Sequence, residues 1–188
     1  MSMTVTRRKD TRTPRVLMHK VADIRGGVSV NVSELGGDYL KEGSVLSAPV
    51  DGISHVVKVA EVVEAVTATA KTVKVKKGHN FKQGDFVLLG ENSVAAEIAA
   101  IDSKGKESDT ITLKTALGVI NVGDCVAEAK EASTNTSVLK YIPLAITGTG
   151  KPVNAGTNLD VDAWLIGVTK GNKLPACVAK YLTGIINY

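Results

Sequence analysis

Residues that could perform chemistry are scattered through this 188-residue chain rather than gathered in motifs. The three histidines, His19, His55 and His79, stand far apart, without a paired histidine or cysteine at the spacing of a zinc motif. The segment Gly148–Pro152 (GTGKP) resembles a phosphate loop only superficially, because Pro152 stands where a Walker A motif needs Ser or Thr. No GxSxG nucleophile elbow occurs. We therefore predict no catalytic, cofactor-binding or metal-ligating residue, no cofactor and no enzymatic activity.

Two carboxylates, Asp85 and Asp124, follow glycines in matching contexts, which favours turn capping over a catalytic pair. The shared phrase has seven positions. It begins with an apolar residue and two spacers, continues with Gly at the fourth position and Asp or Ser at the fifth, and ends with any residue followed by Val or Leu. Glycine supplies the positive φ of such a turn, and the Asp or Ser side chain can bond the turn's own amides. Either an internal duplication or convergent turn chemistry explains the recurrence, and we prefer the second. The phrase occurs at Leu40–Leu46, Phe81–Val87 and Ile120–Val126.

Basic residues gather in two places. The first is a set of lysines around one expected strand and turn, where only Phe81 offers an aromatic ring for stacking, so an oligonucleotide site is not favoured. This set consists of Lys74, Lys76, Lys77 and Lys82.

The second basic region is the N-terminus. The net charge of the chain is +4, yet the first 20 residues hold six Lys/Arg and one Asp. Residues 1–15 lack apolar residues to bury, and we predict that they form a flexible arm. The arm could contact nucleic acid or an acidic protein surface, or it could be a solvated tail. Its candidate contact residues are Arg7, Arg8, Lys9, Arg12 and Arg15.

Composition predicts thin β-layers. The hydrophobic fraction is 44% but aromatics reach only 4%, so the core must consist of Val, Ala, Leu and Ile. Cys125 and Cys177 each lie in an apolar run, which favours two buried free thiols over a disulfide or metal site. No run of 18 apolar residues indicates a membrane span, and the Arg-rich start lacks the apolar region of a secretory signal. We expect a soluble protein made inside the cell.

Hydrophobic periodicity predicts an all-β fold of small barrel or sandwich units with little helix. Val28–Ser33 alternates strictly, as a half-buried strand does. Val56–Val66 and Val94–Ile101 also satisfy helical spacing, but β-branching in the first and the following polar loop in the second favour strands. Ala176–Ile186 is expected to form the last strand or two.

The polar run Ser133–Ser137 is the best candidate boundary within the ordered chain. We predict a flexible arm at 1–15, a β-rich domain at 16–132 and a C-terminal β unit at 138–188. The alternative is that the last two pack as one domain.

Two groups of segments resemble the head-decoration and head-fibre proteins of tailed phages, including prophages of gut bacteria. The resemblance implies a non-enzymatic virion protein, made in the bacterial cytoplasm, that forms trimers and binds the major capsid protein on the capsid surface. The chain lacks a long repetitive stalk, so decoration fits better than a protruding fibre. The alternative is a carbohydrate- or nucleic-acid-binding β-module. The resembling segments are Val73–Val87, Ile98–Asp102 and Asp109–Leu113 in the first group, and Val161–Thr169 and Lys173–Val178 in the second.

Overall fold

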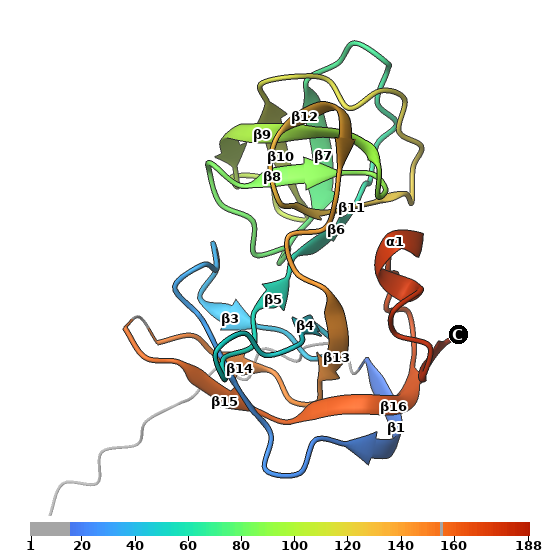
Figure 1. Ribbon diagram of the computed structural model, residues 1–188. Coiled ribbons are helices and arrows are strands. Elements are labelled where there is room, and N and C mark those ends of the chain that lie inside the picture. Colours follow the sequence, from blue (N-terminus) through green and yellow to red (C-terminus); the bar gives the residue numbers. More distant parts are fainter. Residues whose placement is uncertain (1–15, 155) are drawn as a thin grey trace, which may run out of the picture.

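The computed structural model describes residues 16–154 and 156–188. The predicted arm, with Arg7, Arg8, Lys9, Arg12 and Arg15, lies outside the described residues. Strands and isolated β-bridges account for 47% of the described residues and helix for 2%, which confirms the all-β prediction. Figure 1 shows two β units joined by two crossing segments. We call them the base unit, residues 16–57 and 138–188, and the barrel unit, residues 59–137.

The base unit is built on a six-stranded sheet in the order β1-β16-β13-β4-β5, with β17 beside β16 in parallel. All its other pairs are antiparallel. Two short antiparallel ladders, β3–β14 and β2–β15, complete the unit. The strands of the sheet are β1 (Leu17–Asp23), β4 (Val45–Ser47), β5 (Val56–Val57), β13 (Pro143–Thr147), β16 (Ala163–Thr169) and β17 (Ile185–Asn187). The ladder strands are β2 (Val28–Val30), β3 (Tyr39–Leu40), β14 (Lys151–Pro152) and β15 (Leu159–Val161).

The barrel unit is a seven-stranded sheet in the order β6-β11-β8-β9-β10-β7, with β12 also paired to β9. The sheet curls until its two end strands meet, where Val62 bridges Val75 and the Val63 amide donates to the Lys74 carbonyl at 3.0 Å. This curling covers most of the strand edges. The strands are β6 (Val59–Glu61), β7 (Thr72–Lys76), β8 (Phe86–Leu88), β9 (Ser93–Asp102), β10 (Ser108–Leu113), β11 (Cys125–Ala129) and β12 (Ser133–Ser137).

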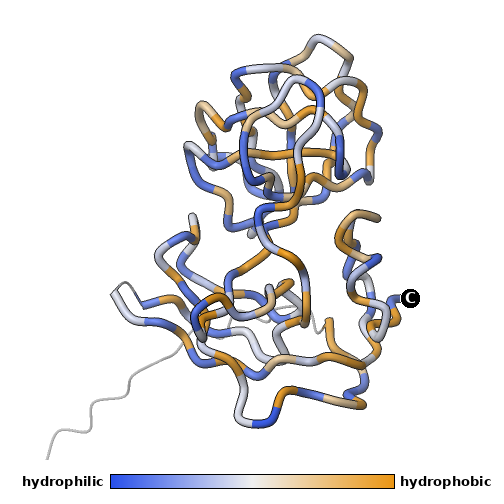
Figure 2. Tube along the Cα trace, in the orientation of Figure 1, coloured by the Kyte–Doolittle hydropathy of each residue, from blue (hydrophilic) through white to orange (hydrophobic). Residues whose placement is uncertain are grey.

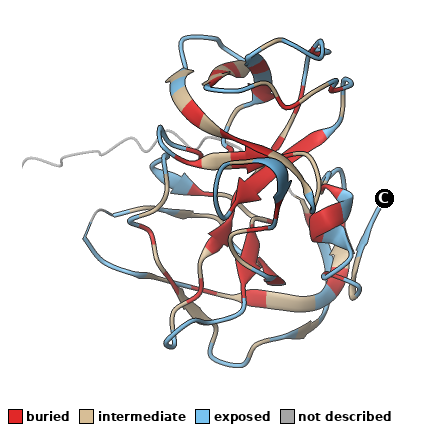
Figure 3. Ribbon diagram, turned by 45° about the horizontal axis from the view of Figure 1, so that its top comes forward, coloured by how far each residue is buried: buried red, intermediate tan, exposed pale blue. Residues whose placement is uncertain are grey.

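Three apolar clusters form the core. One fills the barrel, one lies within the base, and the third joins residues of both units, such as Leu88 of β8 and Ile146 of β13. Apolar and polar residues are interleaved along both units in Figure 2, and Figure 3 shows the buried segments concentrated inside them and where they meet. The third cluster therefore couples the two units by apolar burial, the main stabilising term in folding.

Most strand predictions are confirmed. The two ambiguous segments form β5 with β6, and β9. Strand β7 alternates as expected, with Val73 and Val75 inside the barrel and the lysines outside. Cys125 and Cys177 are buried free thiols, as predicted.

The prediction of one or two strands over Ala176–Ile186 is wrong in its first half. Ala176–Ala179 forms the short helix α1, and only Ile185–Asn187 is a strand. Pro175 begins the turn, and its carbonyl accepts hydrogen bonds from the Val178 and Ala179 amides. Alanine favours helix, and burial of Cys177 and Val178 stabilises it. Within the described residues α1 is the sole α-helix, and no helix there has the length and apolar character needed to cross a membrane.

The recurring glycine turns have the predicted geometry. Gly43, Gly84 and Gly123 take φ values of 78°, 89° and 87°. Asp85 Oδ2 accepts the Lys82 amide at 2.9 Å, and Asp124 Oδ2 accepts the Asn121 amide at 2.8 Å. The third turn differs in detail, because Ser44 Oγ donates to the Lys41 carbonyl at 2.7 Å. The turns lead directly into β4, β8 and β11, so they set where these strands begin.

The pairing of strands divides the chain differently from the expected units at 16–132 and 138–188. Ser133–Ser137 forms β12 rather than a linker. β13 pairs with β4, and β16 pairs with β1, so the segments before Lys58 and after Val138 share one sheet. The barrel is therefore inserted into the base. Local turn composition marks the ends of strands but does not say which distant strands will pair.

Candidate functional site

A buried ion cluster holds the junction between the two units. Lys58 lies between β5 and β6, where the chain first crosses into the barrel. Its Nζ lies 2.6 Å from Asp85 Oδ2 and 3.2 Å from Glu128 Oε1, and the lysine is only 1% exposed. Lys58 is thus a buried cation with two carboxylate partners, an arrangement that is costly to break because a charge would be left unpaired.

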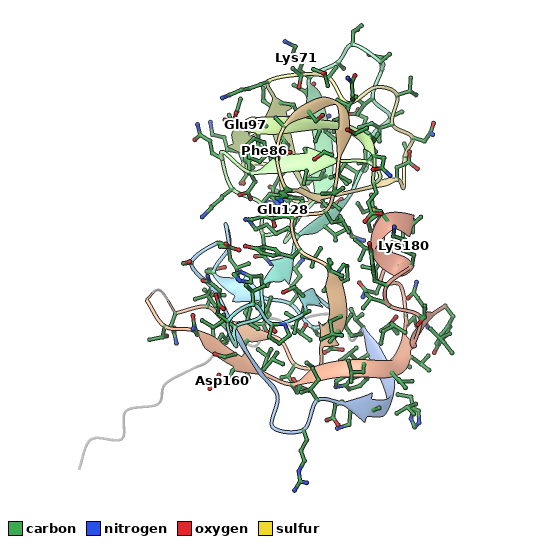
Figure 4. All side chains as sticks on the ribbon, viewed as in Figure 1. Lys71, Phe86, Glu97, Glu128, Asp160 and Lys180 are labelled. Carbon is green, nitrogen blue, oxygen red and sulfur yellow. The ribbon has the colours of Figure 1, made fainter. Side chains whose placement is uncertain are left out.

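Glu128 lies where the two units meet (Figure 4), and residues 138–142, the second crossing segment, continue the cluster toward the base. Lys140 Nζ lies 3.0 Å from Glu128 Oε1, and the Tyr141 hydroxyl donates to Glu34 Oε1 at 2.7 Å. His55 stacks on Tyr141 at 4.2 Å, with its Nδ1 3.1 Å from Glu34 Oε2. Burial, then the bond to Glu34, raises the pKa of Tyr141 to about 12. These contacts tie the crossing segment to the base.

A lysine-lined cleft opens beside this cluster, between the two units. Three adjoining cavities share Lys41, Gly78 and His79 in their walls. The cavity that we call the cleft measures about 440 Å³ and has five lysines and two glutamates in its wall. These residues alone give the wall a formal net charge of +3, with histidine neutral. The charged residues are Lys41, Lys76, Lys77, Lys170, Lys173, Glu42 and Glu61.

Lys41 is the central cation of the cleft. It is half-buried, and its Nζ donates to the Lys77 carbonyl at 2.7 Å. Among the residues that the structure describes, no carboxylate lies within ion-pair distance of Lys41 Nζ. Burial, and then the nearby charge of Lys76, lowers the pKa of Lys41. Gly78 makes room for it, because a Cβ at that position would overlap Lys41 Nζ.

His79 is a buried residue in the wall of the cleft. Its Nδ1 accepts the Phe81 amide at 3.0 Å, so the neutral ring carries its proton on Nε2. Nε2 lies 3.2 Å from Asp109 Oδ2, but not at an angle that makes a hydrogen bond. Asp109 Oδ1 instead accepts from Lys77 Nζ at 2.7 Å. Burial lowers the pKa of His79, and the Asp109 charge offsets part of that effect.

The remaining lysines lie at the rim of the cleft. Glu61 Oε1 lies 2.8 Å from Lys173 Nζ, and its Oε2 lies 3.5 Å from Lys76 Nζ. The hydrogen bond from Lys173 lowers the pKa of Glu61 against the opposing effect of burial. Lys170 is exposed, with its Nζ 5.9 Å from the centre of the Tyr188 ring. Glu61 thus forms ion pairs with two rim lysines.

The structure separates the lysine set expected around β7. Lys76 and Lys77 line the cleft, whereas Lys74 points away and pairs with Glu64 at 2.7 Å. Lys82 donates to the Ser33 carbonyl at 3.2 Å. The capping roles expected for the two aspartates are confirmed, but Asp85 has the second role of pairing with Lys58. No group of three or more His, Cys, Asp or Glu within residues 16–154 and 156–188 is arranged to hold a metal ion.

Sequence reasoning missed Lys41, Lys170 and Lys173 as members of one site. A signal existed for Lys41, which occupies the same place in its glycine turn as Lys82 does in the second turn. A signal also existed for Lys58, a single lysine flanked by valines in a strand-forming run. Nothing local relates Lys41 to Lys173, because they meet only through the fold of the base.

No protein-family model, curated protein or solved structure matches this chain.

Proposed function

We propose that the chain is a non-enzymatic virion structural protein that decorates a phage capsid surface. The observation that carries the proposal is an exposed apolar face on the base unit, over three adjacent strands. We call this the apolar face; its residues are Met18 and Val21 on β1, Ile166 on β16, Ile186 on β17, and Tyr188. Large exposed apolar patches are typical of protein–protein contact surfaces.

Strand pairing places the β16 and β17 members of the apolar face on one side of the sheet, whereas Met18 and Val21 lie at register shifts of β1. Val168 of β16 is paired with His19 of β1 and with Ile186 of β17, so their side chains lie on one side of the sheet. Ile166 lies two residues before Val168 and shares that side. β1 is also the end strand of the sheet, and no other strand of the described residues pairs with its second edge. A face that combines apolar side chains with an open strand edge suits assembly between copies, and we propose a trimer.

The resemblance to decoration proteins supports the rest of the proposal. The trimer binds the major capsid protein through the N-terminal half of each chain, and the basic arm reaches an acidic neighbouring surface. The arm is joined to β1 at Val16, so it starts beside the apolar face rather than on the barrel. The site of action is then the capsid surface, after synthesis in the bacterial cytoplasm. Contacts spread over an area, rather than reaction chemistry, perform this function.

Light scattering tests the assembly. The wild-type chain should have the mass of a trimer, and Ile186→Asp should shift it toward monomer because a charge is placed in the apolar face. Val119→Asp is the matched control, since Val119 is 64% exposed on the barrel unit and Ile186 is 63% exposed on the base. A wild-type monomer, or equal effects of both variants, would contradict the proposed interface.

Co-sedimentation with empty phage shells tests the partner. The full chain should sediment with shells, and replacing Arg7, Arg8, Lys9, Arg12 and Arg15 by glutamine should weaken binding, most clearly at low salt. Exposed charge pairs are screened beyond about 8 Å at physiological ionic strength. A monomer that ignores shells at low salt would contradict decoration and favour the carbohydrate- or nucleic-acid-binding alternative.

A further inference from the structure

We infer that the cleft between the two units binds carboxylate groups of an acidic polypeptide segment supplied by a partner. This inference goes beyond the proposed function and does not rest on it, because it concerns any partner with such a segment. It starts from the charge imbalance of the cleft wall, where five lysines face two glutamates.

The imbalance centres on Lys41. Glu61 is shared by Lys76 and Lys173, and Asp109 pairs with Lys77, so these lysines have carboxylate partners within the chain. Lys41 has only the Lys77 carbonyl, which leaves two of its three donors free of side-chain partners among the described residues. The Asp109 charge opposes the lowering of the Lys41 pKa but does not form an ion pair with it, and a half-buried ammonium without an ion-paired carboxylate is costly. A carboxylate from outside would supply that charge and two acceptor oxygens.

Glu42, the second glutamate of the wall, is already occupied. Its Oε1 accepts the Val16 amide at 2.9 Å and the Leu17 amide at 2.6 Å, which fixes the start of β1. It is therefore held against the backbone of β1 rather than against Lys41. Glu42 therefore does not pair with Lys41, and among residues 16–154 and 156–188 no other carboxylate forms an ion pair with it.

The dimensions and lining favour a polypeptide over a nucleic acid. A volume of about 440 Å³ holds a few side chains, and Val16, Val59 and Ala60 supply apolar wall for their stems. The wall contains no Phe, Tyr or Trp, whereas single-stranded nucleic acids are usually bound by stacking bases on such rings. The two glutamates also disfavour densely charged phosphates more than separate carboxylates.

The sequence of the basic arm does not have the charge that the cleft calls for. Residues 1–15 carry five Lys/Arg against one Asp, and they continue from Val16, which lies in the cleft wall. Like charges repel, so the charge of this segment does not complement the cleft wall. An acidic segment is complementary to both. Opposite charges on the segment and on this protein also raise the rate at which the two meet.

Fluorescence anisotropy with a labelled peptide of alternating Glu and Ala tests the inference on the full chain at low salt. The peptide should bind, and Lys41→Met should weaken binding about tenfold or more, since a hydrogen bond to a charged group contributes about 1.5–3 kcal/mol. Lys170→Gln, an exposed change at the rim, should weaken it by a smaller factor and guards against misfolding of the Lys41 variant. Lys74→Met is the matched control, since Lys74 is on β7 but outside the cleft wall, and it should bind as wild type does.

Several results would overturn the inference. The first is the absence of peptide binding at low salt. The second is binding that is unchanged in both Lys41→Met and Lys170→Gln, because the contact would then be on the arm alone. Equal binding of a Gln–Ala peptide would remove the role of carboxylates. Tighter binding of a single-stranded oligonucleotide with the same dependence on Lys41 would assign the cleft to nucleic acid. No shell is present in the assay, so its outcome is separate from that of the decoration tests.

Discussion

Lys58 and Lys41 lie at the same junction between the two units, yet their surroundings differ. Lys58 is 1% exposed and has Asp85 and Glu128 against its ammonium group. Lys41 is half-buried and has a backbone carbonyl as its partner, with the ammonium of Lys76 nearby. The more deeply buried lysine is therefore the better neutralised one. Burial alone therefore does not make Lys41 a candidate for binding; what sets it apart from Lys58 is that no carboxylate among the described residues forms an ion pair with it.

The largest expected effect is that of Lys58→Met on stability. The variant leaves buried Asp85 without its cation and leaves Glu128 with Lys140 alone, so the free energy of unfolding should fall by about 3–5 kcal/mol. Urea denaturation followed by circular dichroism measures it. Adding Glu128→Gln should recover part of the loss, because one buried negative charge is then removed. A loss no larger than that of Lys74→Met, which breaks an exposed pair, would mean that Lys58 and Lys41 do not differ as described.

Gly78→Ala should have the next largest effect and would disturb Lys41 without changing its charge. Gly78 has a φ of 79°, and a side chain there costs about 1–2 kcal/mol. The new Cβ also occupies the place of Lys41 Nζ, so the lysine must move. Acidic-peptide binding should weaken along with stability. Gly84→Ala, at a φ of 89° with open space around its Cβ, should lose similar stability but leave peptide binding intact.

His79, beside Lys41, should make the stability of the protein depend on pH. Burial lowers its pKa below 6.5, and Lys41 and Lys77 contribute while Asp109 opposes. The unfolded chain therefore binds this proton more tightly, so stability from His79 is complete above pH 6.5 and is lost as pH falls through the folded-state pKa. Each pKa unit corresponds to about 1.4 kcal/mol. Unfolding free energies at pH 7.5, 6.5 and 5.5 should decline less in His79→Gln than in wild type. Parallel curves would show that His79 stays hydrated; His19→Gln, on the exposed face of β1, is the control.

Lys41→Met should change stability least, by less than about 1 kcal/mol. It removes one hydrogen bond to the Lys77 carbonyl, but it also removes a poorly neutralised charge. The two effects oppose each other. Thermal unfolding at neutral pH measures the difference. A loss as large as that of Lys58→Met would assign Lys41 to the framework of the junction rather than to a ligand.

The local features of the fold could be predicted from the sequence. β-branched runs and glycine turns indicated the strands because φ preference and alternation act within a few residues, as in β7 and the turn at Gly84. Helix α1 was missed because four residues after Pro175 are too short to show a helical period. The insertion of the barrel into the base was missed because strand partners such as β1 and β16 are about 150 residues apart.

The candidate site was less predictable than the fold. Lys76 and Lys77 were singled out from their spacing along one strand, but Lys41 and Lys173 reach the same cleft from separate loops of the base. Asp85 was assigned to turn capping, and its second bond, to Lys58, depends on how β8 packs beside the crossing segment. Side-chain pairing across units requires the tertiary arrangement, which residue types do not encode locally.

The two crossings between the units have a mechanical consequence. The Glu128 amide donates to the Lys58 carbonyl, and the Lys140 amide donates to the Glu128 carbonyl, so the outgoing and returning chain are fastened to one residue. A pull applied to the two ends of the described chain would reach β1 and β17, which both pair with β16, before it reached the barrel. Leu17 and Asn187 both pair with Thr169 at one end of β16, so the pull would peel β1 and β17 away from β16 while the barrel carried no load. In a stretching experiment the base should therefore yield first, and the barrel should unfold in a later, separate event.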